Sequence, residues 1–159
     1  DVEAIADRRR GTGEAARLHM SIAQEIVFEG RPLRRPACLV SGGETTVEVT
    51  GGGKGGRNQQ LALAVLHELQ SRGELGSKLT PRPMVFVSGG TDGEDGPTDA
   101  AGAWIDSQSS LRAADMGLEA EKFLRSADAY HFFERVGGLL LTGPTGTNVC
   151  DLRVALVGR

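Results

Sequence analysis

The spacing of apolar residues predicts two long amphipathic helices. Between residues 13 and 29, apolar side chains recur every three or four positions, with Thr12 as the expected cap and Gly30–Pro32 as the stop. A second apolar stripe begins after Asn58, the expected cap of that helix, and fades at Arg72. Three shorter helices are predicted at 106–116, 118–127 and 128–136.

Short apolar or alternating runs predict strands at 37–41, 45–50, 84–88, 139–142 and 153–157. Strands and helices alternate along most of the chain. We therefore expect an α/β fold, in which residues 1–159 form a single domain around a mostly buried mixed sheet flanked by helices. Trp104 and the aromatic group Tyr130, Phe132 and Phe133 are expected in the core. His67 and His131 are expected to be partly buried structural residues, and no catalytic role is assigned to them or to His19.

Composition adds one strong signal. Gly accounts for 23 of the 159 residues, about twice the usual share of roughly 7%. The glycines cluster at 41–44, 51–56, 88–96 and 142–146, each beside an apolar run, so they predict loops at strand ends. Cys38 and Cys150 lie far apart in apolar surroundings and are expected to be buried thiols.

Charge and hydropathy exclude some partners. The net charge of −3 gives no basic field for nucleic acid, and no apolar run approaches the roughly 20 residues that span a membrane. We expect a cytoplasmic protein with no nucleic-acid or membrane partner. Arg8–Arg10 are expected to form a solvated patch. Because the chain opens at Asp1 without an initiator Met, it is expected to be processed or cut from a longer polypeptide.

The loop at 51–58 is suited to an anion. Its glycines allow backbone N–H groups to approach a ligand, a helix start adds partial positive charge, and Lys54 and Arg57 add full charges. The loop is not a Walker A element, because Gly55 stands where the magnesium-binding hydroxyl would be. Gly51, Gly53 and Gly56 match G-x-G-x-x-G, but the acidic residue expected after the next strand is missing. A solvated connection is the structural alternative.

Two further kinds of loop carry candidate chemistry. The segment 88–99 has four carboxylates, which could bind Mg²⁺ or accept hydrogen bonds from substrate hydroxyls, although their order breaks the calcium-loop pattern. The alternative is a surface loop whose Asp side chains cap nearby amides. The segments 41–46 and 142–148 combine Gly with hydroxyl residues and could bind a phosphate or a polyol, or simply be tight turns.

Four segments together form a specific signature: SGGETTVEV, GGGKGGRNQQLALA, SGGTDGEDGPTDAAGAWID and GLLLTGPTGTNVCDLRVALVG. With them the chain resembles the C-terminal MOFRL domain of class II glycerate kinases, some of which carry the older label hydroxypyruvate reductase. The resemblance covers about residues 13–157. It implies a two-domain enzyme with a larger N-terminal Rossmann-like domain, which these 159 residues lack, and an active site in the cleft between the domains.

The resemblance implies transfer of the γ-phosphoryl group of ATP to the 2-hydroxyl of D-glycerate with Mg²⁺. Arg57 and Asp92 would then be catalytic, with Arg57 stabilising the transferring group or binding the glycerate carboxylate. Asp95 and Asp99 are the candidate metal ligands. The candidate substrate- and phosphate-binding residues are Ser41, Gly42, Gly43, Glu44, Thr45, Lys54, Gly55, Gly56, Asn58, Thr91, Gly93, Thr145, Gly146, Thr147 and Asn148.

Family members also need residues of the missing domain, including a lysine, so the isolated fragment is expected to have little turnover. Two other functions stay open. One is an NAD(P)H-dependent hydroxypyruvate reductase, as the older label says. The other is a noncatalytic domain that uses these loops only to dock with a partner chain.

Overall fold

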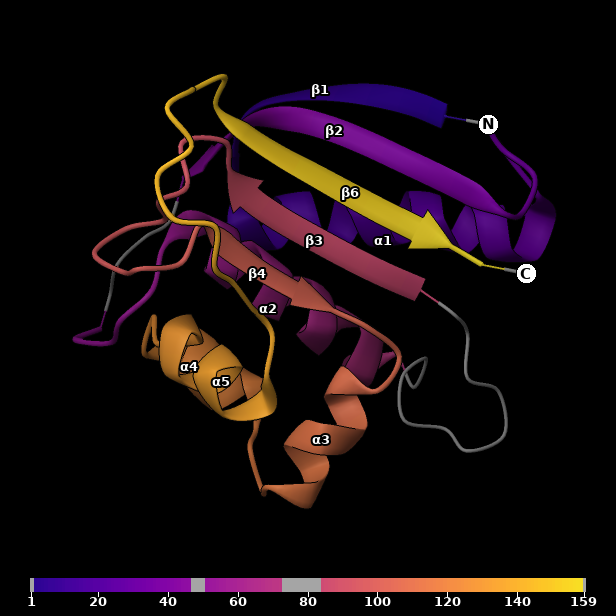
Figure 1. Ribbon diagram of the computed structural model, residues 1–159. Coiled ribbons are helices and arrows are strands. Elements are labelled where there is room, and N and C mark those ends of the chain that lie inside the picture. The colour runs from indigo at the N-terminus through magenta and orange to yellow at the C-terminus, as the bar shows by residue number, and fades with distance from the viewer. Residues whose placement is uncertain (1, 47–50, 73–83, 159) are drawn as a thin grey trace.

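A mixed sheet of six strands forms one layer of the domain (Figure 1). The computed structural model describes residues 2–46, 51–72 and 84–158, and for residues 2–10 it gives the backbone alone. The strand order is β1-β2-β6-β3-β4-β5; β1 and β2 are parallel and every other pair is antiparallel. The predicted α/β class with a mixed sheet is confirmed. The strands are β1 (Val2–Gly11), β2 (Ala37–Thr46), β3 (Met84–Gly90), β4 (Gly102–Ile105), β5 (Leu139–Leu140) and β6 (Asp151–Val157).

All five predicted helices are present: α1 (Thr12–Glu29), α2 (Arg57–Ser71), α3 (Ser109–Asp115), α4 (Ala120–Arg125) and α5 (Ala129–Val136). α1 ends as expected at Gly30, whose φ of 66° is the left-handed conformation that glycine adopts easily. The N-caps differ from the expectation, because α1 begins after Gly11 and α2 after Gly56, neither with a side-chain cap of its own. Within the described residues, no helix has both the length and the apolar composition that crossing a membrane requires.

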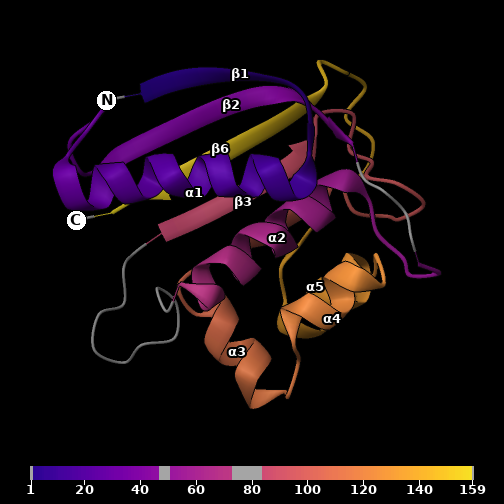
Figure 2. The ribbon, with the colours of Figure 1, turned by 180° about the vertical axis from the view of Figure 1, so that it is seen from behind.

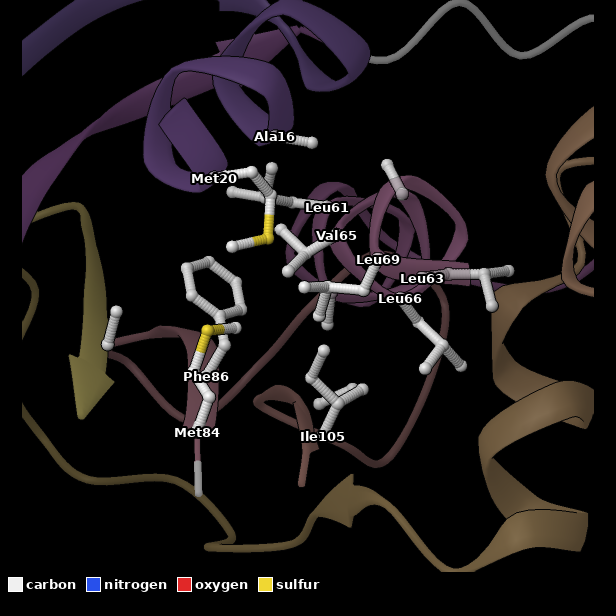
Figure 3. Packing of buried hydrophobic residues seen from close by; sticks show 14 of the residues in the cluster. Ala16, Met20, Leu61, Leu63, Val65, Leu66, Leu69, Met84, Phe86 and Ile105 are labelled. Atoms are coloured by element: carbon white, nitrogen blue, oxygen red, sulfur yellow. The ribbon is translucent and has the colours of Figure 1, made fainter. Parts of the chain in front are cut away.

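The helices α1 and α2 cover one face of the sheet (Figure 2). α2 is the central helix, because it contacts α1, β3 and β4 as well as α4 and α5. Its residues 58–66 are all buried, which explains why its apolar pattern is nearly continuous. Figure 3 shows the resulting core, in which Leu61 and Val65 of α2 lie beside Met20 of α1 and Phe86 of β3.

No helix of the described residues covers the other face of the sheet, which we call the open sheet face. In Figure 1 no helix crosses in front of β1, β2, β6 and β3. Leu152 and Leu156 of β6 are each 46% exposed on this side, and Val85 of β3, paired with Leu156, is 37% exposed. In most half-covered sheets apolar side chains face the core and polar ones face solvent. β6 has the opposite arrangement, because its charged Asp151 and Arg153 are buried beneath the helices and its leucines are exposed. The expected burial of the sheet is achieved on one face and is partial on the other.

Three strand assignments differ from the sequence prediction. Residues 41–44 lie inside β2 rather than in a loop, because Gly42 and Gly43 pair with β1 on one side and β6 on the other. β1 and β4 were not predicted; β1 is fixed by its pairing with β2, and β4 is a four-residue strand beside β3. The predicted strand 45–50 contributes Thr45 and Thr46 to β2, and its residues 47–50 lie outside the described part of the chain.

Several side-chain expectations were also tested. Tyr130, Phe132 and Phe133 are buried as predicted, whereas Trp104 is half-buried. The prediction of two buried thiols is wrong, because Cys150 lies in the exposed segment 141–150 and Cys38 is half-buried on the open sheet face. His67 is half-buried, but His131 is exposed and contacts Asp128. The side chains of Arg8–Arg10 lie outside the described residues.

Candidate functional site

The site lies where three strands meet the start of α2. β2 and β3 run in the same direction and end beside the beginning of β6, so that Gly43, Asp151 and Gly90 lie side by side. A cavity of about 460 Å³ opens at this edge. It is lined by Thr45, Gly55, Gly56, Arg57, Asp92, Glu94, Asp95, Gly96 and Pro97.

Arg57, the first residue of α2, is the cation of this cavity. Its Nε and Nη2 donate to the two carboxylate oxygens of Asp151 at 2.7 and 2.9 Å, a bidentate ion pair. Its Nη1 also lies 3.1 Å from Oε1 of Glu44. The hydrogen bond to Asp151 raises the pKa of Arg57 above its ordinary value. The cavity therefore has a permanently charged guanidinium in a fixed orientation.

Asp95 caps α2 from a distant loop. Its two carboxylate oxygens accept the backbone N–H groups of Asn58 and Gln59 at 3.0 and 2.9 Å. These are the helix-start donors that the sequence assigned to a phosphate. The protein's own carboxylate occupies them instead, so an anionic ligand in the cavity depends on Arg57 and on the glycine loop in front of it.

A buried polar network connects this cap to Arg57. Asn58 donates through Nδ2 to Asp95 at 3.3 Å and to Asp151 at 3.1 Å, and its Oδ1 accepts the Ser88 hydroxyl at 2.6 Å. Asn58 and Ser88 are fully buried, and Asp95 is 3% exposed. Asn58 is therefore a structural link in the wall of the cavity rather than a group that reaches a ligand.

Burial raises the pKa of Asp95 to about 6, against the N–H groups that favour its charged form. The folded chain then holds a proton that the unfolded chain, with the ordinary value of 3.8, has already released. We expect the free energy of unfolding to fall between pH 4 and 6, by up to about 3 kcal/mol from this group. Urea unfolding of the wild type and of Asp95→Asn checks this; parallel pH profiles would contradict it.

The predicted hydroxyl loop at 142–148 packs through Thr145 and Asn148 against the loop after β3. The backbone N–H of Thr145 donates to the carbonyl of Asp92 at 3.0 Å, and Asn148 Nδ2 donates to Asp92 Oδ2 at 3.0 Å. Thr91 also connects the two loops, because its hydroxyl donates to the carbonyl of Cys150 at 2.8 Å. Thr145, Thr147 and Thr91 line a separate, largely apolar cavity of about 400 Å³ over β3 and β6. These residues therefore hold Asp92 at the edge of the first cavity.

Lys54 and Asp99 are not among the residues that line the cavity. Lys54 Nζ lies 3.7 Å from the centre of the Tyr130 ring, and the Tyr130 hydroxyl donates to Asp99 at 2.8 Å, which lowers the pKa of Asp99. Asp99 is thus held by a different contact from Asp95, the other expected metal ligand. The described residues contain no group of three or more His, Cys, Asp or Glu side chains placed to bind a metal ion.

Ser41 also lies away from the cavity. Its hydroxyl is 2.6 Å from Nε2 of the buried His19, whose Nδ1 lies 2.7 Å from the carbonyl of Ala15. Because a carbonyl can only accept, Nδ1 carries the proton and the Ser41 hydroxyl donates to Nε2. The pair fixes α1 on the sheet.

The structure brings together seven of the predicted site residues in the lining or beside Arg57: Glu44, Thr45, Gly55, Gly56, Arg57, Asp92 and Asp95. Sequence reasoning missed Asp151, which is buried and binds Arg57 and Asn58. The sequence feature that could have indicated it is the position of Asp151 directly before the mainly apolar run of β6.

The sequence of this chain matches a known protein family. The MOFRL family model matches residues 37–151, most of the chain and nearly all of the elements that form the cavity. The chain belongs to the MOFRL family. The matched range begins with β2 and ends at Asp151, so both carboxylates bound to Arg57 fall within it.

Relatives of this MOFRL domain are kinases by name. It is 45% identical over 144 residues to the D-glycerate 2-kinase of Thermotoga maritima. The aligned residues make up 91% of this chain and 32% of the relative. This domain is 51% identical over 121 residues to the human glycerate kinase, covering 74% of this chain and 22% of the relative. The chain thus spans about a third or less of these relatives.

A solved structure agrees with the fold. The crystal structure of the glycerate kinase from Thermotoga maritima superimposes with a TM-score of 0.88 at 42% identity, over 99% of this chain and 36% of that one. The superimposed fold therefore makes up about a third of that longer polypeptide.

Proposed function

We propose that this MOFRL domain supplies one side of the active site of a glycerate 2-kinase, which transfers the γ-phosphoryl group of ATP to the 2-hydroxyl of D-glycerate. The products would be 2-phosphoglycerate and ADP. The other side would come from further parts of a longer chain, as the lengths of the relatives suggest. The observation that carries the proposal is the oriented guanidinium of Arg57 at a polar cavity.

Phosphoryl transfer fits such a cavity because it needs positioned charge more than covalent chemistry. The transferring group carries negative charge on its oxygens, and glycerate carries a carboxylate. Arg57 would bind one of these anions with the N–H groups that Asp151 leaves free. Gly55 and Gly56 form the wall beside it. The buried Thr45 Oγ1, which has no partner among the described residues, is a further donor in the lining.

Mg²⁺ and ATP fit this chain in part. Both oxygens of Asp95 are taken by α2, and Asp99 is bonded to Tyr130, whereas Asp92 and the exposed Glu94 also line the cavity. Asp92 Oδ1 accepts the Glu94 N–H at 3.2 Å and Oδ2 accepts Asn148 Nδ2 at 3.0 Å, which leaves each oxygen one lone pair for a ligand. Mg²⁺ commonly takes one or two protein carboxylates and completes its shell with phosphate oxygens and water. A bound Mg²⁺ would neutralise part of the negative charge of the phosphate groups. Asp92 would hold it or accept a glycerate hydroxyl.

The reductase alternative finds less support in the loop geometry. In G-x-G-x-x-G the glycines let a dinucleotide approach the backbone. Here a Cβ on Gly53 would lie 2.5 Å from the carbonyl oxygen of Ser126, so this glycine permits two loops to pack together. Its N–H donates to the same oxygen at 3.1 Å.

Ligand-dependent thermal unfolding of this chain tests the proposal. A ligand at about 100 times its Kd adds roughly 2.7 kcal/mol, and each kcal/mol moves Tm by about 2–4 °C for a domain of this size. We expect inorganic phosphate, D-glycerate or Mg-ATP to raise the Tm of the wild type and of Arg72→Ala, a control at the other end of α2. The shift should be absent in Arg57→Ala.

Three results would count against the proposal. An equal shift in Arg57→Ala would remove Arg57 from the site. A shift with NADPH alone would favour the reductase. The absence of any shift with all of these ligands would favour the docking domain.

A further inference from the structure

Asp151 occupies a position that is built to receive a guanidinium. It is the first residue of β6, and its side chain is fully buried on the helix side of the sheet. Its neighbours on the adjacent strands are Gly43 of β2 and Gly90 of β3. Neither neighbour has a side chain, and the loop after β3 fills the space beside Gly90, where a Cβ would lie 2.5 Å from the carbonyl oxygen of Glu94. Arg57 and Asn58 reach the carboxylate from α2.

The carboxylate holds Arg57 by one particular edge. A guanidinium has five N–H donors, one on Nε and two on each Nη. Asp151 takes the Nε donor and one Nη2 donor, with Asn58 Nδ2 as a third donor to the same carboxylate at 3.1 Å. Asp151 leaves both donors of Nη1, which faces Glu44 at 3.1 Å, and the second donor of Nη2. These lie along the end of the guanidinium, where two oxygens of a phosphoryl or carboxylate group could bind side by side.

Glu44 cannot fix Arg57 in the same way. Its side chain is 62% exposed, and its Oε1 lies 3.1 Å from Nη1, the group that a ligand would use. Exposed ion pairs contribute little because water screens them and both side chains must be ordered. Glu44 is therefore an exchangeable neighbour, whereas the buried Asp151 is a permanent one.

We propose that Asp151 is the positioning residue of this site: it holds Arg57 by the Nε edge, so that the Nη edge is ordered before an anion arrives. This inference rests on the proposed function for the nature of the anion. Ordering a long side chain in advance spares the ligand that cost, so loss of the contact should weaken anion binding by about 2- to 10-fold.

The test observes Arg57 directly in this chain, by the ¹⁵N NMR signal of its Nε–H and the rate at which that proton exchanges with water. In the wild type we expect slow exchange compared with the exposed Arg31 and Arg125. Asp151→Asn should accelerate the exchange, while the backbone amide signals of β6 and α2 persist. Glu44→Gln is the matched control, and it should leave the Nε–H protected.

The wild type alone can overturn the proposal. Exchange at Arg57 as fast as at Arg31 would show that Asp151 does not hold it, even if Asp151→Asn fails to fold. Protection that persists in Asp151→Asn would overturn it as well.

Titration with inorganic phosphate then separates positioning from function. Weaker binding in folded Asp151→Asn than in the wild type supports the proposal, and equal binding despite a mobile Arg57 contradicts it. If the wild type protects the Nε–H and Asp151→Asn loses it, but neither binds phosphate, Asp151 still positions Arg57 and the proposed anion-binding role fails.

Discussion

Arg57→Ala is expected to lower kcat for D-glycerate phosphorylation by about 10³-fold in the longer kinase chain that the proposed function requires. An arginine that stabilises transition-state charge in phosphoryl transfer is worth about 10³–10⁵ in kcat, and the lower bound is apt because the buried Asp151 already offsets part of the Arg57 charge. The measurement is steady-state kinetics with ATP and D-glycerate both varied.

Two controls separate catalysis from folding. The variant leaves the buried Asp151 without its ion pair, which destabilises proteins by about 3–5 kcal/mol, so its unfolding midpoint must lie well above the assay temperature. Arg72→Ala, near the end of the same helix, removes an ion pair with Glu68 and should leave kcat within a factor of two. A kcat for Arg57→Ala near that of Arg72→Ala would rule out a catalytic role.

Gly56→Ala is expected to reduce the free energy of unfolding by roughly 2–5 kcal/mol, the sum of overpacking and a lost helix cap. A Cβ on Gly56 would lie 2.3 Å from the carboxylate of Asp95. Asp95 would have to withdraw from the N–H groups of Asn58 and Gln59 that it caps. Tm should fall by roughly 5–15 °C.

The same loop offers a matched control. Gly52 is exposed, and a Cβ there would meet nothing within 4 Å, so Gly52→Ala should change the unfolding free energy little. Equal Tm values for Gly52→Ala and Gly56→Ala, measured by calorimetry, would show that the close approach of Asp95 to Gly56 is not required.

Local patterns predicted the helices better than the strands. α1 and α2 have long apolar stripes that are visible in the local sequence, whatever elements the helices pack against. Both helices were predicted and both are present. β1 was missed because its charged sequence gives no strand pattern; the pairing with β2 determines it. The run Ser41–Glu44 looks like a turn for the opposite reason, because its glycines are extended only by having a strand on each side.

The candidate site shows the same division. Arg57 and the glycine loop before it could be assigned because a strand, a glycine cluster and a helix follow one another in sequence. The partners of Arg57 and α2 could not, since Asp95 lies 36–37 residues from its α2 partners and Asp151 lies 94 from Arg57. The sequence predicted Asp95 as a metal ligand, and it gave no sign that this carboxylate also caps α2, a contact that forms only in the folded chain.

We propose that this domain serves phosphoryl transfer to D-glycerate. The most direct test is ³¹P NMR of the full-length enzyme with Mg-ATP and D-glycerate, followed by the same enzyme with NADPH and hydroxypyruvate. We expect signals of ADP and 2-phosphoglycerate to grow together in the first sample and NADPH to remain reduced in the second. Consumption of NADPH with no phosphorylated product would contradict the account.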